Sequence, residues 1–117
     1  MQIEYLEIVT PDVDAVCANY EQVHGVRFGA PVAELGHART ADLANGGMIG
    51  VRAPMSESEA PIVRPYMRVD DAEAAVEAAQ AAGGEIALPA MEIPGHCTFA
   101  IWIQGGIHHA AWQPQSG

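Results

Sequence analysis

The sequence predicts an α+β fold built from two tandem βαβββ modules. Two observations support this prediction: strand-like and helix-like segments follow the same order in both halves, and turn residues recur at a spacing of 59. The repeated residues fall at helix starts, helix ends and hairpin turns: Asp12 and Asp71, Gly25 and Gly84, Gly36-His37 and Gly95-His96, Gly46-Gly47 and Gly105-Gly106. Backbone geometry selects such residues, so their recurrence indicates a repeated fold. We expect a single domain over 1–117, with module one at 1–54, a linker at 55–61 and module two at 62–114.

The first module opens with a strand and an amphipathic helix. Residues 3–9 alternate as a strand does, and residues 10–25 carry helix signals. Thr10 can cap the helix, Pro11 suits its first position and Gly25 can end it. Helical spacing predicts one buried face, made of Val13, Val16, Cys17, Tyr20 and Val23. Strands are predicted next at 26–35, 37–44 and 48–54, the last two joined by the hairpin turn Asn45-Gly46-Gly47.

The second module repeats this order after a polar, proline-bracketed linker. A strand is predicted at 62–69, followed by an alanine-rich helix that Asp70 or Asp71 opens and Gly83-Gly84 closes. Strands follow at 85–93, 98–103 and 106–113, and Gly105-Gly106 forms the last turn.

Composition excludes some partners. The chain has 5 basic and 15 acidic residues, a formal charge of -10, which repels nucleic-acid phosphates and anionic membrane surfaces. No basic residue precedes an apolar run near the start, and the longest apolar run, 99–103, is too short to cross a bilayer. We therefore expect a soluble, cytoplasmic protein in which Cys17 and Cys97 are reduced, structural thiols.

Tandem βαβββ modules of this length resemble the vicinal oxygen chelate superfamily, which includes glyoxalases, bleomycin resistance proteins and extradiol dioxygenases. The stretch "YLEIVTPDVDAV" resembles part of the family's first module, and the chain from "PYMRVDD" to "HHAAWQ" resembles its second. The resemblance implies a glyoxalase-like half-open barrel, with the helices outside and one ligand cavity within. It also implies a homodimer. The family contains lyases, isomerases, epimerases, dioxygenases and metal-free binding proteins, so it does not fix one reaction.

The resemblance also places the metal ligands of the family's enzymes. They lie on the first strand of each module, seven residues before the helix-opening Asp, and on the last strand, four residues after its leading Gly. In this chain the four positions hold Tyr5, Val51, Arg64 and Ala110. Val and Ala offer no lone pair, and Arg stays protonated and repels a cation. We therefore expect no metal cofactor at the family site; a divalent metal at a relocated site using Glu7 and His108 is the alternative.

The adjacent histidines His108 and His109 point to opposite faces of their predicted strand, so they cannot both bind one ion. If position 110 faces the cavity as in the family, His108 and Trp112 also face inward and His109 faces the helix. On the first strand of each module, the same alternation turns Tyr5, Glu7, Arg64, Tyr66 and Arg68 inward. Together with the two residues of the last strand, the predicted ligand-binding set is Tyr5, Glu7, Arg64, Tyr66, Arg68, His108 and Trp112. The alternative is structural: Glu7 pairs with one arginine, the aromatic residues form core, and His108 is a semi-buried histidine.

Two functions fit these residues. The first is binding of a small organic ligand in the barrel cavity without the family's metal. The alternative is a lyase, isomerase or dioxygenase of the same superfamily, using relocated metal ligands, or using His108 as a general base while Arg64 or Arg68 stabilises an oxyanion. A third possibility is an interaction module whose cavity is filled by side chains.

Overall fold

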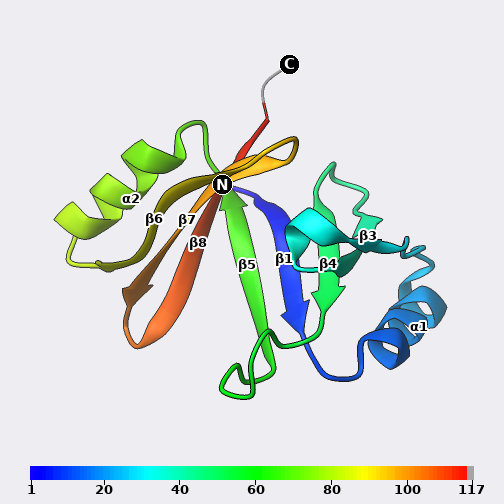
Figure 1. Cartoon of the computed structure of the whole chain (residues 1–117). Helices are drawn as coiled ribbons and strands as arrows, with labels where there is room; N and C mark the ends of the chain where they lie inside the picture. The colour runs from blue at the N-terminus through cyan, green and yellow to red at the C-terminus, as the bar shows by residue number, and fades with distance from the viewer. Residues whose placement is uncertain (116–117) are drawn as a thin grey trace. The chain divides into compact units, whose positions relative to one another are not determined.

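The computed structural model describes residues 1–115 and divides the chain into two compact units. One is Tyr5–Val63; the other joins Met1–Glu4 to the chain from Arg64 onward. Each unit holds one α-helix and four strands, which confirms the predicted βαβββ order (Figure 1). The linker residues 55–61 form neither helix nor strand and belong to the first unit. Within residues 1–115 no helix combines the length and apolar character that a membrane crossing requires.

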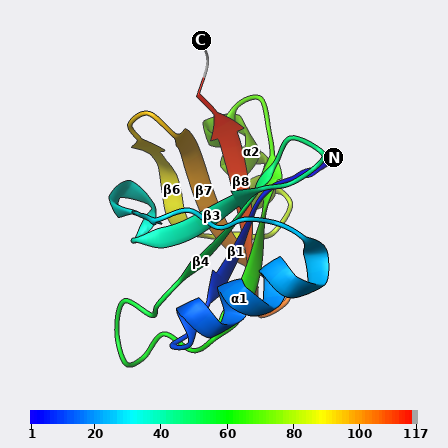
Figure 2. The ribbon, with the colours of Figure 1, turned by 90° about the vertical axis from the view of Figure 1, so that its right-hand side faces the viewer.

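The first unit is a four-stranded sheet with a helix on one face. Its elements are β1 (Ile3–Val9), α1 (Val13–His24), β2 (Pro31–Val32), the 3-10 helix η1 (Ala33–Leu35), β3 (Ala38–Asp42) and β4 (Met48–Arg52). The strand order is β2-β3-β4-β1, with β1 parallel to β4 and the other pairs antiparallel. Cys17 of α1 packs against Ile8, Ile49 and Val51, so the core lies between α1 and this face (Figure 2).

Three predictions for the first module are corrected. The strand expected at 26–35 is reduced to Pro31–Val32. Phe28 is buried there instead, and its N–H donates to Glu21 Oε2 at 3.0 Å, which draws the chain toward α1 and away from strand pairing. Val23, in the last turn of α1, is 63% exposed, so the predicted buried face does not extend to the end of the helix. The helix begins after Asp12, and Thr10 Oγ1 accepts from the Asp12 N–H in a local turn.

The second unit has the same arrangement and matches its prediction more closely. Its elements are β5 (Ile62–Arg68), α2 (Ala72–Ala81), β6 (Glu85–Ile93), β7 (Cys97–Gln104) and β8 (Ile107–Pro114). The strand order is β5-β8-β7-β6, with β5 parallel to β8. Helix α2 packs against β6, β7 and β8. Strand β6 lies at the edge of this sheet and has register shifts on both sides of Leu88.

The register of the parallel strand pair differs by one residue between the modules. In the first unit Glu7 pairs with Gly50, and in the second Tyr66 pairs with Ala110. Glu7 and Tyr66 are 59 residues apart (66 − 7), whereas Gly50 and Ala110 are 60 apart (110 − 50). Equivalent residues are therefore 59 apart in β1 and β5 but 60 apart in β4 and β8. Because side chains alternate along a strand, this shift of one residue turns a side chain to the opposite face of the sheet.

The two repeated aspartates at the helix starts offer a matched stability test. Asp71 Oδ1 accepts from the Ala74 N–H at 3.1 Å and caps α2, whereas Asp12 makes no such side-chain bond at α1. We expect Asp71→Ala to lower the free energy of unfolding by about 1 kcal/mol and Asp12→Ala to change it by only a few tenths. Urea unfolding measures both. Equal losses in the two variants would contradict this difference in capping.

Candidate functional site

The face of the second sheet turned away from α2 carries three packed aromatic rings. Gln113 Oε1 accepts from the Ala72 N–H at the start of α2, so the adjacent Trp112 points to the other face. There, Tyr66 meets Trp112 edge to face, with ring centroids 5.7 Å apart at 87°. It also meets Phe99 at 6.3 Å and 61°. These are the favourable geometries for aromatic pairs, so the three rings form one cluster.

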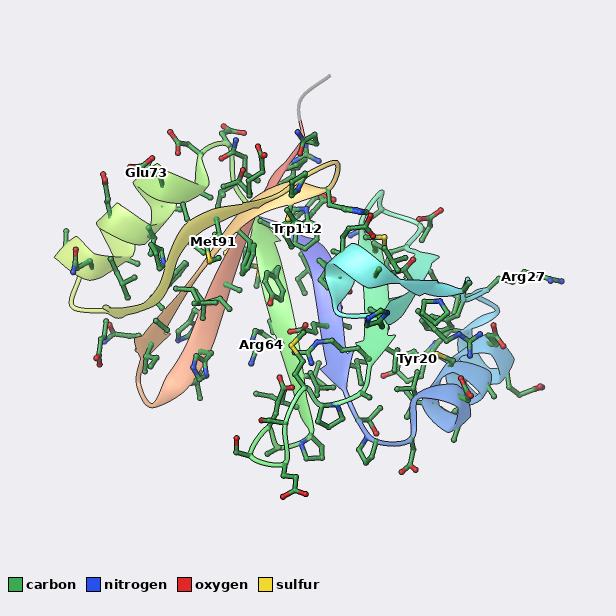
Figure 3. The ribbon with its side chains drawn as sticks, in the orientation of Figure 1. Tyr20, Arg27, Arg64, Glu73, Met91 and Trp112 are labelled. Carbon is green, nitrogen blue, oxygen red and sulfur yellow. The ribbon has the colours of Figure 1, made fainter. Side chains whose placement is uncertain are left out.

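Strand pairing extends this cluster as two apolar rows across the sheet. One row runs from Tyr66 through Ala110 and Ile101 to Leu88, and the other runs from Trp112 through Phe99 to Met91. Leu88 is 39% exposed and Met91 46% exposed, because they lie on the edge strand β6. We call this surface the aromatic face; its members are Tyr66, Leu88, Met91, Phe99, Ile101 and Trp112. Figure 3 labels Met91 and Trp112 on it.

Three predicted polar residues flank the aromatic face. Arg64 and Arg68 lie two residues before and after Tyr66 on β5, so their side chains leave the strand on the same face. Arg64 is half-buried, while Arg68 is more exposed and donates from Nη1 to Glu4 Oε1 at 3.2 Å. Figure 3 labels Arg64 on β5. His108 lies two residues before Ala110 and is exposed.

His109 lies on the opposite face, as the alternation predicts. Its ring stacks on Trp102 with centroids 6.0 Å apart at 22°, and its Nε2 is 3.0 Å from the Gln104 carbonyl oxygen. The adjacent histidines therefore project from different sides of β8. His108 alone of the two shares a face with Tyr66 and Trp112.

In the first unit, Tyr5 and Glu7 lie on the face of the sheet turned away from α1. Both are buried, with 3% and 7% exposure. Tyr5 packs directly over Gly50, so that a Cβ at that position would overlap the tyrosine hydroxyl. This glycine is required by close packing and not by backbone conformation.

Glu7 is bound in a buried ion cluster with Arg52 and Glu59. Arg52 donates from Nε to Glu7 Oε2 at 2.8 Å, and from Nη1 and Nη2 to the two Glu59 oxygens at 3.0 and 2.7 Å. Hydrogen bonding to Glu59, and then to Glu7, raises the pKa of Arg52 above its ordinary value against the opposing effect of burial. Glu59 Oε1 also accepts from the Met55 N–H at 2.7 Å, so the cluster anchors the linker.

In this cluster Glu7 pairs with an arginine, which is the structural alternative to a ligand-binding role. The sequence did not identify Arg52 as that arginine. Arg52 lies on the last strand of the first module, where it shares a face with Glu7 and Gly50. With position 51 assigned to the cavity by the family spacing, alternation along β4 places Arg52 on the helix side, so the register shift conceals this pairing. Nothing in the sequence marks Glu59 as its second partner.

The residues at the implied metal positions do not fit a metal site. Val51, at a position that the family spacing implies, is fully buried against Cys17 on the α1 side of its sheet, because β4 is shifted by one residue relative to the repeat. Gly50 and Arg52 share the face with Tyr5 instead, and neither is a metal ligand in its ordinary state. In the part of the chain that the structure describes, no three His, Cys, Asp or Glu side chains are grouped to hold an ion.

Both cysteines are buried and free. Burial raises the pKa of Cys17 and raises that of Cys97 to about 12. A thiol must lose its proton to act as a nucleophile or metal ligand, so these two residues are suited to packing and not to chemistry.

An open depression of about 490 Å³ lies on the first unit. It is lined by Pro11, Pro54, Met55, Ser56, Glu57, Glu59 and Pro61. It contains none of the predicted ligand-binding residues, and the linker forms most of its wall.

Solved structures match this chain over almost its whole length. Methylmalonyl-CoA epimerase from Streptomyces coelicolor, in complex with 2-nitronate-propionyl-CoA, is 16% identical, with 99% of each chain covered and a TM-score of 0.73. Methylmalonyl-CoA epimerase from Mycobacterium tuberculosis is 17% identical, with 97% of this chain and 88% of that one covered and a TM-score of 0.75. A hypothetical protein from Bacillus halodurans is 12% identical, with 99% and 96% covered and a TM-score of 0.75.

These similarities define the class of protein by its fold. No protein-family model matches the sequence, and no curated protein matches it. At 12% to 17% identity, a structural match shows the fold alone. The chain has the vicinal oxygen chelate fold, as the resemblance implied.

Proposed function

We propose that this protein binds a small organic ligand on the aromatic face of its second module, without the metal that the family's enzymes use. The observation that carries the proposal is the composition of that face. Packed aromatic rings adjoin two large apolar side chains, Leu88 and Met91, that remain exposed. Small-molecule sites are mostly apolar and aromatic with a few polar groups that orient the ligand, and Arg64 and His108 provide such groups here. The unbranched thioether of Met91 adapts readily to a bound shape.

The charge of the protein favours a ligand with fewer negative charges than the 2-nitronate-propionyl-CoA in the Streptomyces coelicolor epimerase complex. Coenzyme A thioesters carry several phosphate charges, which proteins usually hold with clustered arginines and lysines. This chain has 5 basic residues and a net charge of -10. Arg39, Arg52 and Arg68 are each paired with carboxylates, so a group of cations able to hold phosphates is not available on the described units.

A thermal-shift screen of protein treated with a chelator tests this function. A ligand at about one hundred times its dissociation constant adds about 2.7 kcal/mol to the free energy of unfolding. We expect apolar and aromatic organic compounds to raise the melting temperature with and without chelator. Stoichiometric metal in the purified protein, or stabilisation that disappears with chelator, would contradict metal-free binding. If no compound in a broad panel stabilises the protein, the ligand-binding function is contradicted, and an interaction module with a cavity filled by side chains fits the protein better.

An acid–base enzyme is the second candidate, and the position of His108 favours it. Its exposed imidazole shares a face with the half-buried Arg64, so a base and an oxyanion-stabilising cation flank the same apolar surface. His108 would take a proton from carbon next to a carbonyl group and return it. In D2O such a ligand should exchange that hydrogen for deuterium, and His108→Ala should stop the exchange while a thermal shift persists, reduced by the loss of one orienting group. Binding without exchange in the wild type would leave only the first candidate.

A further inference from the structure

We propose that the second module docks a basic segment of a partner protein on the side of its sheet that carries α2. The contact surface consists of Trp102, Ile107 and His109, at the end of the sheet where β7 turns into β8; we call it the hairpin patch. The aromatic face lies on the opposite side of the same sheet. Docking at the hairpin patch therefore goes beyond the proposed function and does not depend on it.

Two stacked rings form the fixed part of the hairpin patch. His109 pairs with Trp102 across β7 and β8, and their ring centroids lie 6.0 Å apart at 22°. The backbone at Gly84 also packs against the indole, since a Cβ there would lie 3.1 Å from Trp102 Cδ1. His109 Nε2 is 3.0 Å from the Gln104 carbonyl oxygen, and because a carbonyl only accepts, this nitrogen carries a hydrogen. Rings held in place before binding lose little conformational entropy when a partner docks.

Ile107 is the most exposed apolar part of the hairpin patch. It is 60% exposed and lies two residues before His109, so both side chains leave β8 on the same face. Trp102 and His109 are half-buried beside it. A single exposed aliphatic side chain is ordinary on a protein surface, whereas one that adjoins two partly exposed rings extends them into an apolar surface. Since Ile107 directly follows a turn, it is placed to contact a protein surface rather than to enclose a small ligand.

The charge on this side of the second module selects a basic partner. No arginine or lysine follows Arg68 in the sequence. Four exposed carboxylates lie on α2 or just before it: Asp70, Asp71, Glu73 and Glu77. Figure 3 labels Glu73 on this helix. Glu77 lies five residues before the C-cap Ala82, about 7.5 Å along the helix axis, so its carboxylate attracts a cation bound at that end even at physiological salt.

The C-terminal end of α2 adds to this negative charge. The carbonyl groups at a helix end carry a partial negative charge, and the last turn of α2 contains no basic residue. A Cβ at Gly83 would lie 3.9 Å from Gln104 Oε1, so this end of α2 lies beside the turn between β7 and β8 (Figure 1). A lysine or arginine of the partner can therefore approach α2 while a neighbouring apolar side chain contacts Ile107. A second copy of this chain is a poorer occupant, because it has no lysine and a net charge of -10.

The test measures fluorescence anisotropy of a labelled peptide of alternating lysine and leucine, with the whole chain as receptor. Reference peptides replace every lysine with glutamate or every leucine with serine. We expect the lysine–leucine peptide to bind about tenfold more tightly than either reference, and its affinity to fall as salt is added. In Trp112→Phe, which leaves Trp102 as the single emitter, the peptide should change the emission; in Trp102→Phe it should not.

Variants with exposed side chains locate the contact. Ile107→Ser should weaken binding about tenfold, because one large apolar contact is lost. Val23→Ser is the matched control, since Val23 is 63% exposed on α1 of the first unit, and it should leave the affinity unchanged. Glu73→Gln combined with Glu77→Gln should weaken binding and reduce its salt dependence, whereas Glu34→Gln in the first unit should do neither. Circular dichroism establishes that each variant is folded.

Four results would overturn docking of a basic segment at the hairpin patch. They are no binding of the lysine–leucine peptide, binding no tighter than that of the glutamate–leucine peptide, equal losses in Ile107→Ser and Val23→Ser, and an emission change confined to Trp112. Self-association in analytical ultracentrifugation that Ile107→Ser abolishes would also overturn it, by making a second copy the occupant. None of these results bears on small-molecule binding at the aromatic face, which the thermal-shift screen tests separately.

Discussion

Replacing Arg52 with alanine is expected to lower the free energy of unfolding by about 3–5 kcal/mol, because it leaves two carboxylates without their cation. The Arg52 side chain is only 5% exposed and lies between Glu7, at 9%, and Glu59, at 24%. Without the guanidinium, two nearby carboxylates repel each other in a partly buried site and lose their hydrogen bonds. The linker residue Glu59 would also lose both of its hydrogen bonds to Arg52. Urea denaturation followed by circular dichroism measures the loss.

Arg39→Ala is the matched control for this prediction. Arg39 belongs to the same unit and donates from Nη1 to Asp14 Oδ1 at 2.9 Å, but the Asp14 side chain is 92% exposed. Solvent screens such a pair, so we expect a loss of at most about 1 kcal/mol. If Arg52→Ala cost no more than Arg39→Ala, the buried cluster would not hold the linker as described.

Tyr66→Ala is expected to cost about 3–5 kcal/mol of stability, because it removes the central ring of the aromatic cluster. Tyr66 is 6% exposed and contacts both Trp112 and Phe99 edge to face. Its loss leaves a cavity and removes both ring contacts. The matched variant Tyr66→Phe keeps the ring, and we expect it to lose less than half as much. Equal losses would show that the hydroxyl group, and not the ring cluster, determines the stability of this face.

The sequence was most informative where local geometry selects the residue. Gly25 ends α1 in the left-handed region at φ 70°, and Asp71 caps α2, as their positions predict. The strand expected at 26–35 failed because tertiary packing of Phe28 outweighs local strand propensity. The repeat spacing could not reveal the register shift of β4, because pairing between distant strands depends on contacts that no local pattern records.

For the candidate site, the sequence predicted which face of the second sheet a side chain lies on, but not which side chains contact one another. Alternation correctly separated His108 from His109 and placed Tyr66 beside Trp112. The pairing of Glu7 with Arg52 joins residues 45 positions apart, so only the folded chain identifies it. The exposure of Leu88 and Met91 depends on the irregular register of an edge strand, which apolar sequence positions alone do not show.

The central claim is that a ligand occupies the aromatic face, and the chain's two tryptophans test it directly. Trp112 lies on that face, whereas Trp102 stacks on His109 on the opposite one. Trp102→Phe leaves Trp112 as the single emitter, and Trp112→Phe leaves Trp102. In fluorescence titrations with the compound that gives the largest thermal shift, we predict a saturable change in Trp112 emission and none in Trp102 emission. A saturable change confined to Trp102, or binding that alters neither, would contradict the account.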